Sequence, residues 1–265
     1  MATAAQFDAR SEQLRAAVDG HPRLTGLVLL GSAAEEARPR RDEWSDHDFF
    51  AIIADGSGAL LRPDLSWLPG QASLAATARE GEIGFVALYD DGHVFEFALA
   101  ELGELDSAVA EEATVVSDAD GRLTALVDAA RTRAQTRGRH DAAGEATLVF
   151  VKLLIGVGRA HRGEVLAAGE FVRTWAVQCL VRAVRARAAE AAGVAAGDAA
   201  PPIDPVRRFE RDHPVVAGRI AHALERPVAD AARELYDIAR QTLEPGWEQF
   251  PTRAADAVAL RLGWR

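Results

Sequence analysis

Cysteine is almost absent from this sequence of 265 residues, in which Cys179 is the only one. A single cysteine excludes an intramolecular disulfide framework and is typical of a protein from a reducing compartment. Cys179 lies in residues 175–181, an apolar stretch with helical spacing, where a thiol usually serves as a small core residue. We therefore expect Cys179 to be buried and structural.

Long hydrophobic runs are missing as well. No apolar segment approaches the roughly 20 residues that a transmembrane helix needs. The first residues, MATAAQFDARSEQLRAAVDG, also lack the basic start and apolar run of a signal peptide. We therefore expect a cytoplasmic protein with no membrane partner.

The sequence has no excess of positive charge, since 30 Lys and Arg stand against 40 Asp and Glu for a formal net charge of −10. A nucleic-acid partner would favour a basic groove, and the net charge here has the opposite sign. An acidic surface suits a cationic small molecule, although solubility alone explains most of this signal. We therefore expect a small-molecule partner and no nucleic acid.

The first half of the sequence alternates strand-like and helix-like segments. Two continuous apolar runs have the pattern of strands buried on both faces. Two further runs flank Asp90-Asp91-Gly92, the strongest hairpin signal in the chain. Helical spacing opens and closes this half. The expected strands are 24–30, 48–53, 83–89 and 93–99, and the expected helices are 7–18 and 122–137.

The second half consists of helix formers from residue 142 onward, with few strand candidates. Gly163 follows a basic run and has the position of a helix C-terminal cap. Asp204 before Pro205 has the pattern of a helix N-cap followed by proline at the first helical position. We therefore expect further helices at 204–224, 228–243 and 251–260.

Two acidic residues, Asp46 and Asp48, lead into the second apolar strand. Side chains alternate along a strand, so both carboxylates are expected on the same face. Two carboxylates this close repel each other unless a positive charge lies between them. Mg²⁺ is the natural neutralising ion, because it is held by one or two carboxylates while phosphate oxygens complete its octahedron.

Gly31-Ser32 ends the first apolar strand. The glycine permits close approach of the backbone, while backbone amides and the serine hydroxyl can bind a phosphate. The order strand, Gly-Ser turn, loop and D-x-D places a phosphate-binding turn beside a metal-binding pair. That combination is typical of phosphoryl or nucleotidyl transfer.

A third carboxylate is expected from a neighbouring strand. Glu96 lies in the segment HVFEFAL, on the face opposite Phe95, Phe97 and Leu99. A charged residue centred in a strand is costly to bury unless it is paired or metal-bound. We interpret Glu96 as the third metal ligand and as a candidate general base for the acceptor hydroxyl.

Each of these motifs is weak alone, because D-x-D is common and usually solvated. The ordered set of strand, Gly-Ser, D-x-D and a later acidic strand residue is what predicts a metal and nucleotide site. With that set in place, the first hundred residues resemble the nucleotidyltransferase superfamily that includes DNA polymerase β. Gly31, Ser32, Asp46 and Asp48 match its pattern, whereas His47 stands where an apolar residue is usual.

More narrowly, the sequence resembles the antibiotic-modifying branch, the aminoglycoside and lincosamide nucleotidyltransferases. The segment 83–102, with its hairpin and FEFALAEL, is similar to the part that carries the third carboxylate, which maps onto Glu96. The segment 152–164 resembles the long helix that opens their helical domain. The resemblance implies ATP as donor, two Mg²⁺ ions, and AMP transfer to a drug hydroxyl.

The resemblance also makes Lys152, the only lysine, a candidate ligand of the nucleotide phosphates. A helix lysine whose stem lies along apolar surface is an equally good interpretation. Three of the five tryptophans, Trp67, Trp175 and Trp247, are expected in the core more than at an acceptor site.

The resemblance and the segment patterns together predict an α+β protein with two domains. Residues 1–138 are expected to form the nucleotidyltransferase domain, a mixed β-sheet flanked by helices, and residues 139–265 a helical bundle that binds the acceptor. Two alternatives stay open: adenylylation of a protein side chain, and a nucleotide-binding module without catalysis. The sequence leaves undecided the acceptor, the choice of ATP over other NTPs, the identity of the base, and monomer against homodimer.

Overall fold

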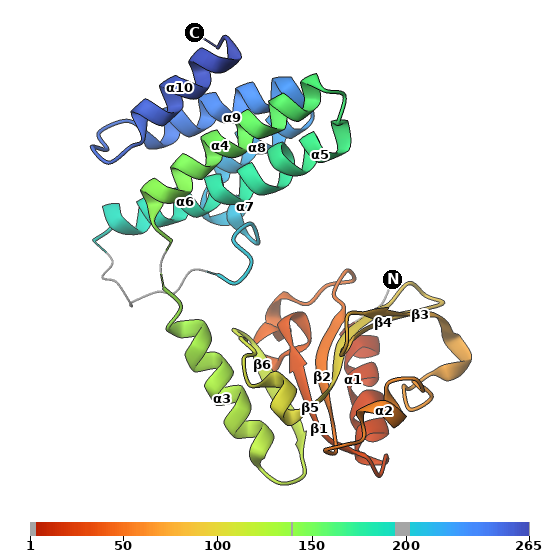
Figure 1. Ribbon diagram of the computed structural model, residues 1–265. Helices are drawn as coiled ribbons and strands as arrows, with labels where there is room; N and C mark the ends of the chain where they lie inside the picture. Colours follow the sequence, from red (N-terminus) through yellow and green to blue (C-terminus); the bar gives the residue numbers. More distant parts are fainter. Residues whose placement is uncertain (1–3, 139, 194–201, 265) are drawn as a thin grey trace. The chain divides into compact units, whose positions relative to one another are not determined.

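The structure is a computed structural model that describes residues 4–138, 140–193 and 202–264 of the chain (Figure 1). It divides into two compact units, Met1–Thr136 and Arg137–Arg265. The first unit is built around a β-sheet and the second consists of helices, so the expected α+β class is confirmed. The division falls at residue 136, close to the predicted domain boundary at residue 138.

The first unit contains one mixed sheet with the strand order β3-β4-β5-β2-β1-β6. Strands β2 and β5 run parallel, and the other neighbouring strands run antiparallel. The parallel pair therefore lies in the middle of the sheet, where the acidic residues are. The strands are β1 Leu24–Leu30, β2 His47–Ile53, β3 Leu74–Glu80, β4 Gly84–Tyr89, β5 Val94–Glu101 and β6 Ala113–Asp118.

The four strands expected from the sequence are confirmed, including the β4–β5 hairpin, whereas β3 and β6 are not predicted. Strand β3 pairs only with β4, at one edge of the sheet, and six of its seven residues are exposed. It therefore lacks the alternation of apolar and polar residues by which a half-buried strand is recognised.

Helices cover the two faces of the sheet with separate hydrophobic cores. Helix α1, Ala4–Asp19, packs through Phe7, Leu14 and Val18 on the face that carries the odd-numbered side chains of β2 and β5. Helix α3, Arg122–Gln135, packs on the opposite face against the even-numbered ones, such as Ile52 and Ala100. The short elements are η1 Gly31–Ala33, η2 Glu35–Arg40, α2 Gly58–Leu61, η3 Gln71–Ser73 and η4 Leu102–Leu105.

The second unit is organised around the long helix α4, Ala142–His161, which contacts most of the other helices of this unit. Its end is confirmed as predicted, since Gly163 adopts a left-handed φ of +78° just beyond it. A continuous helix follows from residue 165 to 191, and its middle segment is a π-helix. The remaining elements are α5 Val165–Gly169, η5 Glu170–Ala176, α6 Val177–Ala191, α7 Phe209–Asp212, α8 Pro214–Leu224, α9 Val228–Leu243 and α10 Thr252–Leu262.

The predicted helix over 204–224 is wrong in its first half. The Val206 amide donates to Asp204 Oδ1 at 3.0 Å, so the expected cap forms a local turn. Arg208 then takes a left-handed φ of +60°, which ends any helical continuation. The long helix of this region begins instead at Pro214, the second proline that fits a first helical position.

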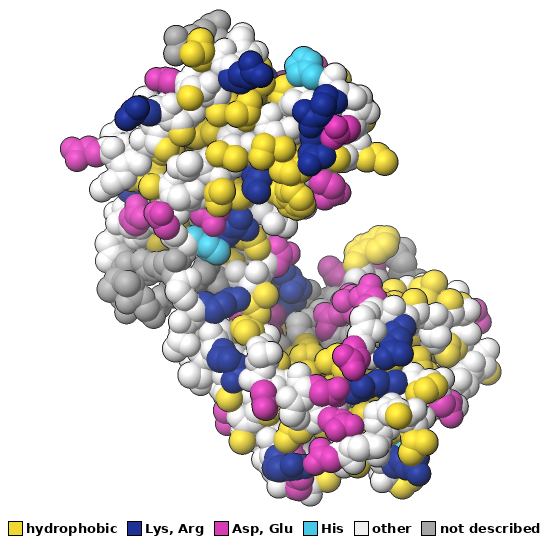
Figure 2. Space-filling model, viewed as in Figure 1, with side chains coloured by type: hydrophobic (Ala, Val, Ile, Leu, Met, Phe, Trp, Pro, Cys, Tyr) yellow, Lys and Arg dark blue, Asp and Glu magenta, His cyan; other side chains and the backbone are white. Residues whose placement is uncertain are grey.

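Trp67 and Trp247 are buried as expected, and so is Cys179. The expectation for Trp175 is wrong, because 41% of this residue is exposed. It belongs with Leu148, Val151 and Ile155 to the exposed apolar residues of the helical unit, on which Figure 2 shows hydrophobic side chains gathered. Along the described part of the chain, no helix combines the length and the hydrophobicity of a membrane crossing.

Candidate active site

The acidic residues predicted from the sequence lie at the start of the two central strands. Asp48 on β2 is the register partner of Glu96 on the parallel strand β5. Register partners on neighbouring strands project from the same face of the sheet, so the two carboxylates are neighbours. Asp46 comes just before β2, and both aspartates are half-buried, whereas Glu96 is exposed.

Gly31 lies directly against Asp48. It has a left-handed φ of +51°, and a Cβ placed on it would lie 3.0 Å from Asp48 Oδ2. A side chain at this position would therefore meet both a backbone penalty and the carboxylate. The absence of a side chain is what allows the turn after β1 to approach the acidic pair.

Ser32 connects the same turn to the other aspartate. Its Oγ lies 2.8 Å from the backbone oxygen of Asp46 and 3.1 Å from Asp46 Oδ1, and the residue is buried. The structure thus brings together Gly31, Ser32, Asp46 and Asp48, with Glu96 beside them.

The donor set of this site fits Mg²⁺. Carboxylate oxygens are hard ligands, and two of them with phosphate oxygens are enough for this ion. In residues 4–138, 140–193 and 202–264, no three His, Cys, Asp or Glu side chains are grouped so that they could hold a metal. The metal-ligand roles of Asp46, Asp48 and Glu96 stay predictions.

Lys152 lies on α4, in the helical unit. Its ammonium is 5.3 Å from the ring centroid of Trp175 and 5.7 Å from that of Phe171. No carboxylate pairs with it among the residues that the structure describes. Its role at the nucleotide phosphates is a prediction, and its packing over two rings shows that the side chain also serves this unit.

His47 points away from the acidic face and is completely buried. Its ring stacks on Phe7 with centroids 3.8 Å apart, its Nδ1 lies 2.7 Å from His93 Nε2, and its Nε2 lies 2.9 Å from Ser11 Oγ. Burial, helped by the nearby His93 and by Arg10, lowers the pKa of His47 to about 2. Burial also lowers the pKa of His93 to about 4. Both rings are therefore neutral at pH 7.

Two residues that the sequence did not single out hold the Gly-Ser turn. Arg40 donates to the backbone oxygen of Gly31 at 3.3 Å and pairs with Glu112. Arg41 donates to the backbone oxygen of Ser32 at 2.8 Å. Sequence offered no signal for either, because arginine is the usual basic residue throughout this chain.

No family model and no curated protein matches this sequence. Among solved structures, it is similar to an aminoglycoside 6-adenyltransferase from Bacillus subtilis, at 11% identity, covering 100% of this chain and 93% of that chain, with a TM-score of 0.29. It is also similar to a nucleotidyltransferase-like protein from Exiguobacterium sibiricum 255-15, at 13% identity over 89% and 75% of the two chains, with a TM-score of 0.34. Both TM-scores are low, so the functional argument rests on the site itself.

Proposed function

We propose that this chain is a metal-dependent nucleotidyltransferase that transfers AMP from ATP to a hydroxyl group of a small molecule. One observation carries the proposal: the Gly31–Ser32 turn contacts both aspartates of the D-x-D pair. Gly31 lies against Asp48, and Ser32 Oγ is 3.1 Å from Asp46 Oδ1. A phosphate-binding turn and a metal-binding pair in direct contact are what a bound Mg²⁺–nucleotide requires.

Asp46 and Asp48 are the proposed metal ligands, and Gly31 and Ser32 the proposed phosphate contacts. A Mg²⁺ ion held by these two carboxylates would neutralise charge on the phosphate oxygens and polarise the phosphoryl group. The turn and the strand fix the two carboxylates before substrate arrives, so little reorganisation is needed during the reaction.

Glu96 is the proposed general base. The acceptor oxygen attacks the α-phosphorus of ATP, a new P–O bond forms, and the bond to pyrophosphate breaks. The hydroxyl proton passes to the Glu96 carboxylate. Because Glu96 is exposed, it can return that proton to water after AMP is transferred.

The proposed acceptor is an amine-bearing small molecule such as an aminoglycoside or lincosamide antibiotic, which would make the protein a resistance enzyme. The family resemblance and the net charge of −10 support a cationic acceptor. The helical unit is the proposed acceptor domain. Within it, η5, α6, α7 and α8 enclose an apolar groove of about 300 Å³, lined by residues such as Val177, Phe209 and Ile220.

The experiment is a titration with ATP and Mg²⁺, followed by a mass-spectrometric screen of aminoglycosides and lincosamides for the gain of one AMP. Wild type is compared with Asp46→Asn/Asp48→Asn. Asp55→Asn is the matched control, because Asp55 is an exposed acid beyond the opposite end of β2. We expect a mass gain in wild type and control that disappears in the double variant.

A transfer that survives in the double variant would show that the aspartates are not the metal ligands. Metal-dependent ATP binding without transfer to any drug would retain the site and discard the antibiotic acceptor. Absence of ATP binding by wild type would contradict the proposed function.

A further inference from the structure

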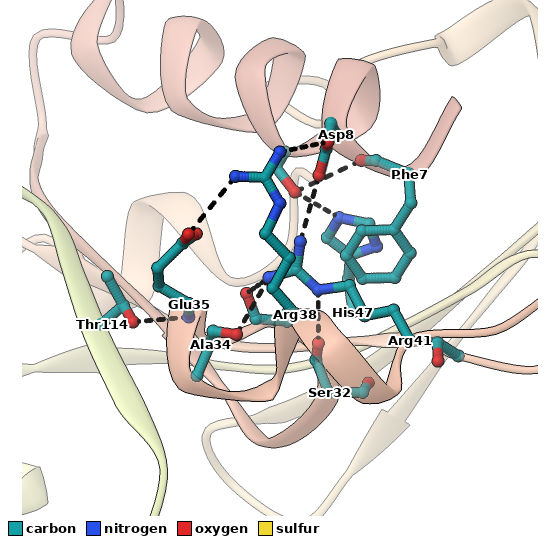
Figure 3. Close-up of polar contacts among 12 residues, drawn as sticks. Phe7, Asp8, Ser32, Ala34, Glu35, Arg38, Arg41, His47 and Thr114 are labelled. Carbon is teal, nitrogen blue, oxygen red and sulfur yellow. Dashed lines mark hydrogen bonds and ion pairs between the residues drawn. The ribbon is translucent and has the colours of Figure 1, made fainter. Parts of the chain in front are cut away.

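The guanidinium of Arg41 is bound on nearly every side by the segment that follows β1. Nε donates to Ser32 O at 2.8 Å, and Nη2 donates to Ala33 O at 2.7 Å and to Ala34 O at 2.9 Å (Figure 3). Nη1 pairs with Asp8 of α1 at 3.0 Å. The side chain is only 8% exposed, so these contacts are shielded from water.

The same guanidinium is linked to the strand that carries the acidic pair through Phe7 of α1. It lies 4.9 Å from the ring centroid of Phe7, and Phe7 in turn stacks on His47. His47 stands between Asp46 and Asp48 in the chain. Arg41, Phe7 and His47 therefore form one buried connection between the Gly-Ser turn and the D-x-D segment, on the side away from the carboxylates.

We propose that Arg41 is a positioning residue that sets the Gly31–Ser32 turn relative to Asp46 and Asp48. It touches none of the reacting groups, and it acts through backbone carbonyls and the Phe7 ring. With these carbonyls bound by Arg41, the backbone of the turn is fixed before a ligand arrives. The consequence for nucleotide affinity rests on the proposed function, whereas the effect on the turn itself does not.

Lysine is the informative substitution. It keeps the positive charge next to Asp8 but has no planar fork, so it cannot bind three successive carbonyls and Asp8 while it also stays over the Phe7 ring. Arg41→Lys should therefore loosen the turn without removing the charge. A residue that merely stabilised the unit would lower the unfolding midpoint and leave the turn as ordered as before.

Arg38 provides the matched control. It comes from the same loop and pairs with the same Asp8 at 3.1 Å, but its side chain is 59% exposed. Arg38 also pairs with Glu35, at 3.3 Å. Arg38→Lys therefore perturbs the same ion-pair group without touching the carbonyls that Arg41 holds.

The test has two measurements on the full chain. Amide hydrogen exchange by NMR reports the turn through the Gly31 amide, bonded to Glu112 O at 3.1 Å, and the Ala34 amide, bonded to Gly31 O at 3.3 Å. Calorimetric titration with ATP and Mg²⁺ reports ligand affinity. We expect Arg41→Lys to raise both exchange rates and the Kd about tenfold, and Arg38→Lys to change neither.

Unchanged exchange at the turn in a folded Arg41→Lys protein overturns the inference, whatever the activity. So does an equal rise in both variants, or a rise in exchange with unaltered affinity in a protein that binds ATP. If wild type does not bind ATP, the proposed function fails, and the exchange measurement still decides whether Arg41 holds the turn. Should Arg41→Lys not fold, Asp8→Ala removes the carboxylate that holds Nη1 of Arg41, and unchanged exchange at the turn in that variant would overturn the inference.

Discussion

The hydroxyl of Ser32 is bonded to Asp46, with Oγ 2.8 Å from the backbone oxygen and 3.1 Å from Oδ1 of the carboxylate. One hydroxyl hydrogen serves both acceptors, so the serine fixes the carboxylate and the start of β2 together. Ser32 was expected from the sequence to bind phosphate. In the structure it also orients a proposed metal ligand.

Replacing Ser32 by alanine should therefore weaken metal use as well as phosphate binding. We expect Ser32→Ala to lower kcat/KM by about 10 to 100-fold, the cost of about 1.5–3 kcal/mol for a hydrogen bond to a charged group. The Mg²⁺ concentration for half-maximal activity should rise. Ser45→Ala is the control, because Ser45 Oγ bonds Asp42 and lies one residue from Asp46. Equal effects in the two variants would contradict an orienting role for Ser32.

Gly31 should tolerate no side chain. Alanine there meets a left-handed φ of +51° and a 3.0 Å approach to Asp48 Oδ2. The backbone alone costs about 1–2 kcal/mol of stability, and we expect activity to be lost through displacement of Asp48. Gly81→Ala is the control, since Gly81 has a φ of +71° with nothing within 4 Å of an added Cβ. It should show the stability loss, measured by urea unfolding, and retain activity.

The histidine pair behind the acids should make the protein sensitive to acid. His47 has a pKa lowered to about 2, against an unfolded value near 6.5. The unfolded chain therefore binds a proton below pH 6.5 that the folded chain does not, and the free energy of unfolding falls as pH falls. Between pH 7 and pH 5 this amounts to about 2 kcal/mol for His47, with a similar contribution from His93 because of its own lowered pKa.

Urea unfolding of wild type and His47→Phe at the two pH values isolates this contribution. Phenylalanine keeps the stack on Phe7 and removes the titrating group, so the loss between pH 7 and pH 5 should shrink by about 2 kcal/mol. His222→Asn, at an exposed position, should retain the wild-type loss. The same pH dependence in all three proteins would show that the buried imidazole is protonated in the folded state.

Lys152 distinguishes a phosphate ligand from a packing residue. Lys152→Met keeps the stem against Phe171 and Trp175 and removes the charge. Under the proposed function we expect the KM for ATP to rise about tenfold, while the free energy of unfolding changes by no more than about 1 kcal/mol. Lys152→Arg should restore most of the affinity. A stability loss without any change in KM would assign the residue to packing alone.

Local rules explain which parts of the fold were predictable. Strands β1 and β2 are continuous apolar runs, and the β4–β5 hairpin carries its own turn signal. Strand β3 has almost no apolar face, and its pairing depends on β4. The false helix start at Asp204 and the true one at Pro214 look alike in sequence, because both place proline at a possible first position. Tertiary packing chose between them.

The sequence by itself determined the core of the candidate site. Gly31 and Ser32 follow β1, and Asp46 and Asp48 lie at the start of β2. The two strands are antiparallel neighbours joined by a short connection, so these four residues meet at one end of the strand pair. Only the tertiary structure decided the contacts between residues that are distant in the chain. Glu96 reaches Asp48 through a parallel pairing, and Arg41 reaches His47 through Phe7 of α1. Such contacts depend on how helices and strands pack, and a side chain carries no local signal of the carbonyl or ring that it will meet.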